Sequence, residues 1–178
     1  MRTVPSGAAT VALGIFWAVG ILVSSSGRTY AQEAASGNQG LVTQKNLSLS
    51  MAKMIAEAAQ AACREKGYHT SVAVVDRAGQ VLVILRDEQA TSQTAEMARR
   101  KAYTARMFSS ATIDFQKRTM DPNYAAQRDL TDILALGGGA PIKVGNETIG
   151  GVGSAGSTQE QDDACAKAGI AKVADLLK

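Results

Sequence analysis

The strongest constraint on the fold is a pair of β-branched runs that only four residues separate. The runs are "TSVAVVD" (70–76) and "VLVILRD" (81–87), and Gly79 in the intervening "RAGQ" suits a tight turn. This pattern predicts a β-hairpin, in which the two strands pair antiparallel. Because both runs are almost wholly apolar, we expect both faces of the resulting sheet to be covered.

Apolar residues that recur at three- and four-residue steps predict three helices. The first helix follows a candidate cap at Thr43, and the second covers 92–110 with Ser92 as its candidate cap. The third begins at Thr158, which forms a capping-box pattern with Gln161. Acidic residues in the first turns of this last helix complement the helix dipole.

Three further strands are predicted between the second and third helices, at 132–136, 140–144 and 147–153. Gly145 and Asn146 join the last two strands as a two-residue turn. The preceding "ATIDFQKRTMDPNYAAQRD" shows no periodicity, and we expect a mobile loop with a helical turn near its end. The fold class is therefore α/β (α+β), in the order α-β-β-α-β-β-β-α, with a mainly antiparallel five-stranded sheet.

The N-terminal segment has the layout of a secretory signal peptide. An apolar run from Ala8 to Val23 follows Arg2, and Thr29 and Ala31 fit the −3 and −1 positions of a cleavage site. An uncleaved membrane anchor is the alternative interpretation of the same run. Cleavage after Ala31 predicts a periplasmic or secreted protein without a stable membrane span. The predicted organisation is a signal peptide, a flexible lead-in and one folded domain, at 1–31, 32–42 and 43–178.

Charge gives no support for nucleic-acid binding. Removal of Arg2 and Arg28 with the signal lowers the basic count from 19 to 17, against 16 acidic residues. A nearly neutral domain in which 4% of the residues are aromatic lacks the basic surface that nucleic-acid binding requires.

Two cysteines, Cys63 and Cys165, lie in the first and third predicted helices. Export would allow a disulfide between them, which we favour, and two buried free thiols are the alternative. No C-x-x-C spacing or histidine cluster accompanies the pair, so the sequence does not indicate a cysteine-based metal site.

The stretch "GVGSAG" (151–156) matches the G-x-G-x-x-G pattern of dinucleotide-binding folds. That motif requires a second parallel strand and an acidic residue about twenty positions further on. Only 22 residues follow the motif, and they predict a single helix. We therefore interpret the glycines as a strand that passes closely under a helix. A turn that binds a carboxylate through its N–H groups stays open as a second interpretation, at Gly153, Ser154, Gly156 and Ser157.

Three segments resemble the GlcG/HbpS family of small haem-binding or haem-degrading-like proteins. They are "VAVVDRAGQVLVILRDEQA", "ARRKAYTARMFSSAT" and "GGGAPIKVGNETIGGVGSAGSTQEQDDACAKAG", in the order that the family has. The resemblance covers the chain from about Thr43 to the C-terminus. It implies a profilin- or PAS-like fold, homo-oligomers, and links to haem binding and iron binding. Fold kinship alone does not settle function, which depends on a site.

The resemblance links the helix segment "KAYTA" to ligand binding, which makes Tyr103 and Thr104 candidates. Met107 shares a helix face with Tyr103, and Met97 precedes it by six residues; such a stripe is also typical of a core-facing helix. Three basic residues are candidate partners for the haem propionates: Lys101, Arg100 and Arg86. The alternative interpretation is that they are solvated cations on the surface. Candidate iron ligands, on a weaker signal, are Asp87, Glu88, Glu96 and His69.

The predicted function is non-covalent binding of haem or another tetrapyrrole by an exported accessory or sensor protein. We place the pocket between the second helix, residues 111–129 and a neighbouring subunit. An organic-acid- or protein-binding module without haem is the alternative. A haem-degrading or small-metabolite enzyme is a third interpretation; no G-x-S-x-G elbow indicates a serine hydrolase.

Overall fold

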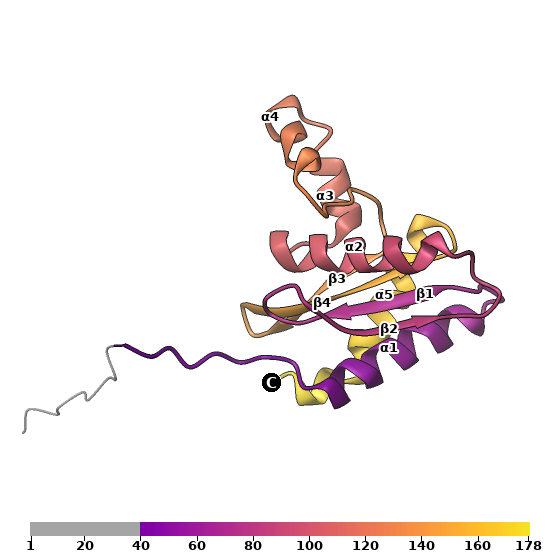
Figure 1. The fold of residues 1–178 in the computed structure, drawn as a ribbon, viewed down its shortest axis with the longest axis horizontal. Helices are drawn as coiled ribbons and strands as arrows, with labels where there is room; N and C mark the ends of the chain where they lie inside the picture. Colours follow the sequence, from indigo (N-terminus) through magenta and orange to yellow (C-terminus); the bar gives the residue numbers. More distant parts are fainter. Residues whose placement is uncertain (1–39) are drawn as a thin grey trace, which may run out of the picture. The chain divides into compact units, whose positions relative to one another are not determined.

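Four strands form one antiparallel sheet in the computed structural model, which describes residues 40–178 (Figure 1). Their order across the sheet is β2-β1-β4-β3. The hairpin predicted for residues 70–87 is confirmed, because β1 pairs antiparallel with β2. The bounds are β1 (Ser71–Val75), β2 (Val81–Arg86), β3 (Gly139–Val144) and β4 (Glu147–Ala155).

Three long helices flank the sheet, and they match the three that the sequence predicts. The first begins later than expected, because Ser48 and not Thr43 is its N-cap, with Ser48 Oγ accepting from Met51 N–H at 3.2 Å. Ser92 precedes the second helix but makes no capping hydrogen bond. Thr158 caps the third as predicted. The bounds are α1 (Leu49–Arg64), α2 (Gln93–Phe108) and α5 (Gln159–Lys172).

The helices cover opposite faces of the sheet, with α1 and α5 on one side and α2 on the other (Figure 1). In β1, the side chains of Val72 and Val74 pack toward α1 and α5, whereas Ala73 and Val75 pack toward α2. This alternation follows from the two-residue period of a strand. All of β1 is buried, as expected for a strand covered on both faces, but the edge strand β2 is partly exposed.

The predicted strand at 132–136 is wrong, and the sheet has four strands where we expected five. Side chains of α2 bind the backbone of this segment instead of a neighbouring strand. Arg100 donates to the Ile133 carbonyl at 2.6 Å, and Leu134 N–H donates to Thr104 Oγ1 at 2.9 Å. Asp132 also has a φ of 67°, which is incompatible with an extended strand.

Residues 111–129 form short helices, so the expectation of a mobile loop is wrong except for the helical turn at its end. Buried Thr112, Phe115 and Thr119 recur at helical spacing, but the threonines conceal this period in a hydrophobicity pattern. The Phe115 ring packs on Phe108 with centroids 4.3 Å apart. The bounds are α3 (Thr112–Arg118), α4 (Pro122–Ala125) and the 3₁₀ turn η1 (Ala126–Asp129).

The glycines of "GVGSAG" bring β4 close to α2. A Cβ on Gly151 would overlap the Ala102 carbonyl oxygen, and one on Gly153 would lie 2.6 Å from the Ala102 nitrogen. Only glycine allows the helix backbone to approach the strand this closely. The structure therefore bears out our interpretation of the motif as a packing device.

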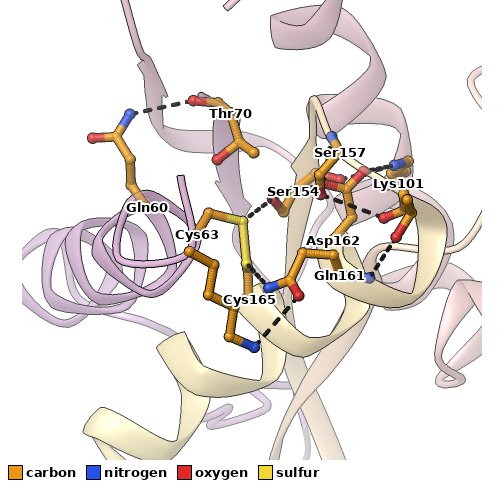
Figure 2. Close-up of a disulfide and its surroundings, with 11 residues drawn as sticks. Gln60, Cys63, Thr70, Lys101, Ser154, Ser157, Gln161, Asp162 and Cys165 are labelled. Carbon is orange, nitrogen blue, oxygen red and sulfur yellow. Dashed lines mark hydrogen bonds and ion pairs between the residues drawn. A yellow bond between two sulfur atoms is a disulfide. The ribbon is translucent and has the colours of Figure 1, made fainter. Parts of the chain in front are cut away.

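The predicted disulfide between Cys63 and Cys165 is present and joins α1 to α5 (Figure 2). The two Cα atoms are 5.5 Å apart, which is an ordinary separation for a disulfide. The capping box predicted at Thr158 forms only in part. The Gln161 backbone N–H donates to Thr158 Oγ1, but the Gln161 side-chain amide points to Cys165 Sγ, 3.3 Å away, and not back to the Thr158 backbone.

Residues 42–178 form one compact unit. The predicted signal peptide at 1–31 lies outside the described residues, as do residues 32–39 of the predicted lead-in. From residue 40 onward, no helix has both the length and the hydropathy that a membrane crossing needs. The likeness to profilin or PAS domains stays a prediction.

Candidate functional site

Tyr103 and Met107 lie together against the turn between β1 and β2. They are four residues apart on α2, so they occupy one face of the helix. Gly79, in the turn, has a φ of 80°, and a Cβ there would lie 2.8 Å from Tyr103 Cε2 and would overlap Met107 Cε. Tyr103 is half-buried and Met107 is exposed. The end of α2 thus presents an aromatic ring and a thioether to the surface.

Lys101 lies deep between α2 and α5, away from that surface (Figure 2). Its ammonium donates to Asp162 Oδ2 at 2.8 Å and to the Ser154 carbonyl at 2.9 Å, and both charged side chains are buried. Burial lowers the pKa of Lys101, and the neighbouring Asp162 carboxylate opposes this shift. The structure therefore gives Lys101 an internal partner instead of an exposed propionate.

The other residues predicted to bind ligand alongside Tyr103 are also held by the protein itself. Thr104 Oγ1 donates to the Arg100 carbonyl at 2.8 Å and accepts from Leu134 N–H. Arg100 binds the Ile133 carbonyl, and Arg86 donates to the Ala90 carbonyl at 2.5 Å. Met97 packs against the alanine-rich cluster under α2.

The predicted anion-binding turn already contains a carboxylate from the chain. Asp162 Oδ1 accepts from Ser157 N–H at 3.2 Å and from Ser157 Oγ at 2.7 Å. Ser154 Oγ lies 3.4 Å from the same oxygen (Figure 2). Gly156 adopts a φ of 140° beside His69 and Thr70. The turn thus completes the burial of the Lys101–Asp162 pair. Binding of an external carboxylate there, with Gly153, stays a prediction.

Two of the four predicted iron ligands lie together. His69 Nδ1 is 3.1 Å from Asp87 Oδ1, and Arg64 donates to Asp87 Oδ2 at 2.6 Å. The backbone N–H of Gln89, followed by Arg64 and His69, lowers the pKa of Asp87 to about 2.

The remaining predicted ligands do not join that pair. Glu96 forms an ion pair with Arg99, and Glu88 is exposed. Within residues 40–178, no group of three His, Cys, Asp or Glu side chains is placed to hold a metal. An iron site stays a prediction.

The His69–Asp87 pair and the Tyr103–Met107 face lie at opposite ends of β1. His69 precedes the strand and Gly79 follows it, and strand residues rise by about 3.3 Å each, so the two places are roughly 20 Å apart or more. The sequence prediction grouped Arg86 with Tyr103, but Arg86 pairs with Ser71 at the start of β1 and therefore lies at the other end of this strand within one chain. The predicted metal ligands His69 and Asp87 lie at that same end.

A polar hollow of about 420 Å³ adjoins the turn and was missed by sequence reasoning. Two arginines, Arg77 and Arg106, contribute cations to it, and no carboxylate lines it. Arg77 precedes Gly79 by two residues and Arg106 precedes Met107 by one, so the hollow borders the Tyr103–Met107 face. Its lining residues are Gln44, Asn46, Arg77, Ala78 and Arg106.

Other hollows open on the outer surface of α1. Two of them share Glu57, Ala61 and Glu65 in their lining. They are distant in sequence from the "KAYTA" segment and carry carboxylates on a helix face. We therefore place the candidate site at the Tyr103–Met107 face and the neighbouring arginine hollow.

Comparisons with known proteins agree with this fold. An uncharacterised 15.0 kDa protein of Citrobacter freundii, encoded in the dhaT–dhaS intergenic region, is 30% identical over 119 residues, which are 65% of this chain and 84% of that protein. The crystal structure of HbpS aligns with a TM-score of 0.72 and 37% identity, covering 78% of this chain and 96% of HbpS. A double mutant of Streptomyces reticuli HbpS gives the same TM-score and identity and is covered to 93%.

The crystal structure of a PduOC–haem complex aligns with a TM-score of 0.64 and 26% identity, over 71% of this chain and 94% of that one. The family model described as haem degrading protein HbpS-like matches residues 47–171, which is more than half of the chain. This protein therefore belongs to the HbpS-like family.

Proposed function

We propose that this chain is an exported haem-binding accessory or sensor protein and that its pocket lies over Tyr103 and Met107. Family membership and the haem complex of PduOC support haem as the ligand. The observation that carries the location is the partly exposed aromatic–thioether face beside a cation-lined hollow. The predicted signal peptide at 1–31 supports export to the periplasm or the medium.

The residues at this face fit the chemistry of haem. Haem combines a flat apolar macrocycle with two carboxylates, so its site needs apolar contacts next to hydrogen-bond donors. Tyr103 and Met107 would supply the apolar contacts, and tyrosine oxygen and methionine sulfur both bind haem iron in other proteins. Bound haem would supply an iron centre at this face.

The segments around this face support a shared pocket. Residues 111–129 extend beyond α2 (Figure 1). The apolar side chains of Met120 and Tyr124 in this segment, and of Leu130 directly after it, are exposed on the single chain. Several exposed large apolar side chains in one segment are typical of an interaction surface. We propose that a neighbouring subunit covers this segment in a homo-oligomer and closes the pocket. Light scattering on a sizing column measures the mass, and a monomeric protein with and without haem would contradict this arrangement.

A titration of the purified protein with haemin tests the proposal. We expect a saturable shift of the Soret band at micromolar haem, and its absence would contradict haem binding. Met107→Leu and Tyr103→Phe should each alter the bound spectrum or weaken the affinity. Met54→Leu is a matched control because Met54 on α1 has the same 37% exposure as Met107. An equal effect of both methionine variants would place the haem elsewhere.

A further inference from the structure

We infer that the hollow between Arg77 and Arg106 is a carboxylate-binding subsite. The hollow would hold a propionate of the ligand that lies over Tyr103 and Met107, so the identity of that ligand rests on the proposed function. The carboxylate chemistry itself rests on the residues of the hollow and can be tested without haem.

Arg106 supplies the available donors. Its side chain begins close to the sheet, because a Cβ on Gly151 would lie 3.2 Å from Arg106 Cβ. Nε donates to the Arg77 carbonyl at 2.6 Å, which fixes the plane of the guanidinium. Neither terminal nitrogen of Arg106 takes part in a hydrogen bond or ion pair among the described residues. A guanidinium that is held at one end and available at the other is well suited to a bidentate carboxylate.

Arg77 lines the hollow, but its positive charge is already paired with a carboxylate of the protein. Its Nη1 donates to the Lys45 carbonyl at 3.1 Å, and its Nη2 forms an ion pair with Glu147. The adjacent Asp76 carboxylate accepts the N–H groups of Ala78 and Gln80 inside the turn and does not line the hollow. The positive charge of Arg106 therefore has no carboxylate partner there.

Asn46 adds a neutral donor with a fixed orientation. Its Oδ1 accepts two backbone N–H groups, from Leu47 at 2.9 Å and from Arg77 at 3.1 Å. Because both bonds reach the oxygen, the Nδ2 end of the amide is the one left to interact with a ligand. The hollow therefore offers a guanidinium and an amide N–H₂ group, which together favour an anionic oxygen ligand.

The hollow and the Tyr103–Met107 face share the same turn. Ala78 lines the hollow, and the next residue, Gly79, lies beneath Tyr103 and Met107. A ligand with an apolar ring and a carboxylate on its edge can therefore contact both surfaces at once. This arrangement replaces the predicted propionate partners Lys101, Arg100 and Arg86, whose side chains bind other groups of the protein.

Haem and haem dimethyl ester distinguish this subsite from a purely structural role of Arg106. Arg106→Gln should weaken haem binding about tenfold, which corresponds to the loss of one charge-assisted hydrogen bond. Affinity for the dimethyl ester, which has no carboxylate, should change less than twofold. Equal losses for both probes would overturn the inference.

Arg86→Gln is the matched control, because Arg86 also donates to a backbone carbonyl but lies at the other end of β1. We expect this variant to bind haem as the wild type does. A loss that equals that of Arg106→Gln would show a general effect of charge and would overturn the inference.

Sodium propionate titrated into the ¹⁵N-labelled wild-type protein tests the hollow independently of haem and of any variant. We expect saturable shifts at Ala78 N–H, the Asn46 side-chain amide and Arg106 Nε–H. The absence of shifts at these groups would overturn the subsite. If these shifts occur and haem does not bind, the proposed function fails while the carboxylate subsite stands.

Discussion

The two faces of the sheet are packed with side chains of different sizes. On the α1–α5 face, larger side chains such as Ile55, Ile142 and Val152 form the main apolar core, and a disulfide joins the two helices. On the α2 face the cluster consists mostly of alanines, and the strand beneath it contains glycines. On the first face, large side chains fill the space between the helices and the sheet. On the second face, small residues let the backbones of helix and strand come close together.

This difference shows how stability and binding are divided in the molecule. Close packing of α2 fixes the positions of its side chains without using large ones, so Tyr103, Arg106 and Met107 remain available at its end. The buried Lys101–Asp162 pair ties α2 to α5 past the end of β4. We therefore expect substitutions on the α1–α5 face to change stability alone, and substitutions on the α2 face to change binding as well.

The largest effect is expected at the buried ion pair that links the two sides. Lys101→Met leaves the Asp162 carboxylate buried without its cation, which should cost about 3 to 5 kcal/mol of unfolding free energy. Urea unfolding measures this loss. The double variant Lys101→Met/Asp162→Leu should recover part of it, because no unpaired charge is then buried. A loss below about 1 kcal/mol for the single variant would show that the pair is not the main link between the sides.

Removal of the disulfide should separate stability from binding. Cys63→Ala/Cys165→Ala is expected to lower the unfolding free energy by about 2 to 4 kcal/mol, because the unfolded chain is no longer constrained. Haem affinity at a temperature where the variant is folded should stay within twofold of the wild type. A larger change in affinity would mean that the α1–α5 face and the site are coupled.

Two glycines with nearly equal backbone angles sharpen the same contrast. Gly79 has a φ of 80° and Gly67 a φ of 78°, so replacing either with alanine should cost about 1 to 2 kcal/mol of backbone strain. Only the Cβ on Gly79 meets Tyr103 and Met107, whereas the one on Gly67 meets no atom within 4 Å. Gly79→Ala should therefore weaken haem binding, and Gly67→Ala should not. Parallel losses of affinity would contradict the placement of the pocket.

The smallest effect concerns Asp87, which connects the end of α1 to the segment before α2. Its pKa is lowered to about 2 in the folded protein, so the carboxylate stabilises the fold fully above its unfolded pKa of about 4. That contribution is lost as the pH falls from about 4 to about 2. Urea midpoints measured through this range should fall more steeply for the wild type than for Asp87→Asn. Identical slopes would show that Asp87 does not contribute to acid stability.

Most of the fold could be predicted because its signals are local. The hairpin, the cap at Thr158 and the helix periods each depend on a few neighbouring residues, and the structure confirms them. Residues 132–136 have the composition of a strand, but side chains 30 and 33 positions away bind their backbone. Hydrogen bonds between segments so far apart in the sequence leave no local pattern from which they could be predicted. The disulfide could be predicted because both cysteines lie in helices that the sequence already places near the two ends of the domain.

The candidate site was predicted only in part. The family resemblance indicated Tyr103, and helix spacing added Met107. Lys101, Arg100 and Arg86 were predicted to bind the propionates. The structure pairs Lys101 with buried Asp162, binds Arg100 to the Ile133 carbonyl, and places Arg86 at the other end of β1. Arg77 and Arg106 are brought together only when the hairpin turn folds against the end of α2. The hydrogen bond between Arg106 and Arg77 joins residues 29 positions apart, and no sequence motif in either segment predicts it.

The disulfide has a consequence for how the molecule responds to proteases. It joins two cysteines that are 102 positions apart and so closes a covalent loop. The loop contains the whole sheet, α2 and the exposed basic residues Lys117 and Arg118. A single tryptic cut at either residue opens the chain without releasing a fragment. The nicked protein keeps one covalent mass, increased only by a water, until a reductant separates its halves. Stored protein can therefore look intact on a non-reducing gel while its backbone is already divided.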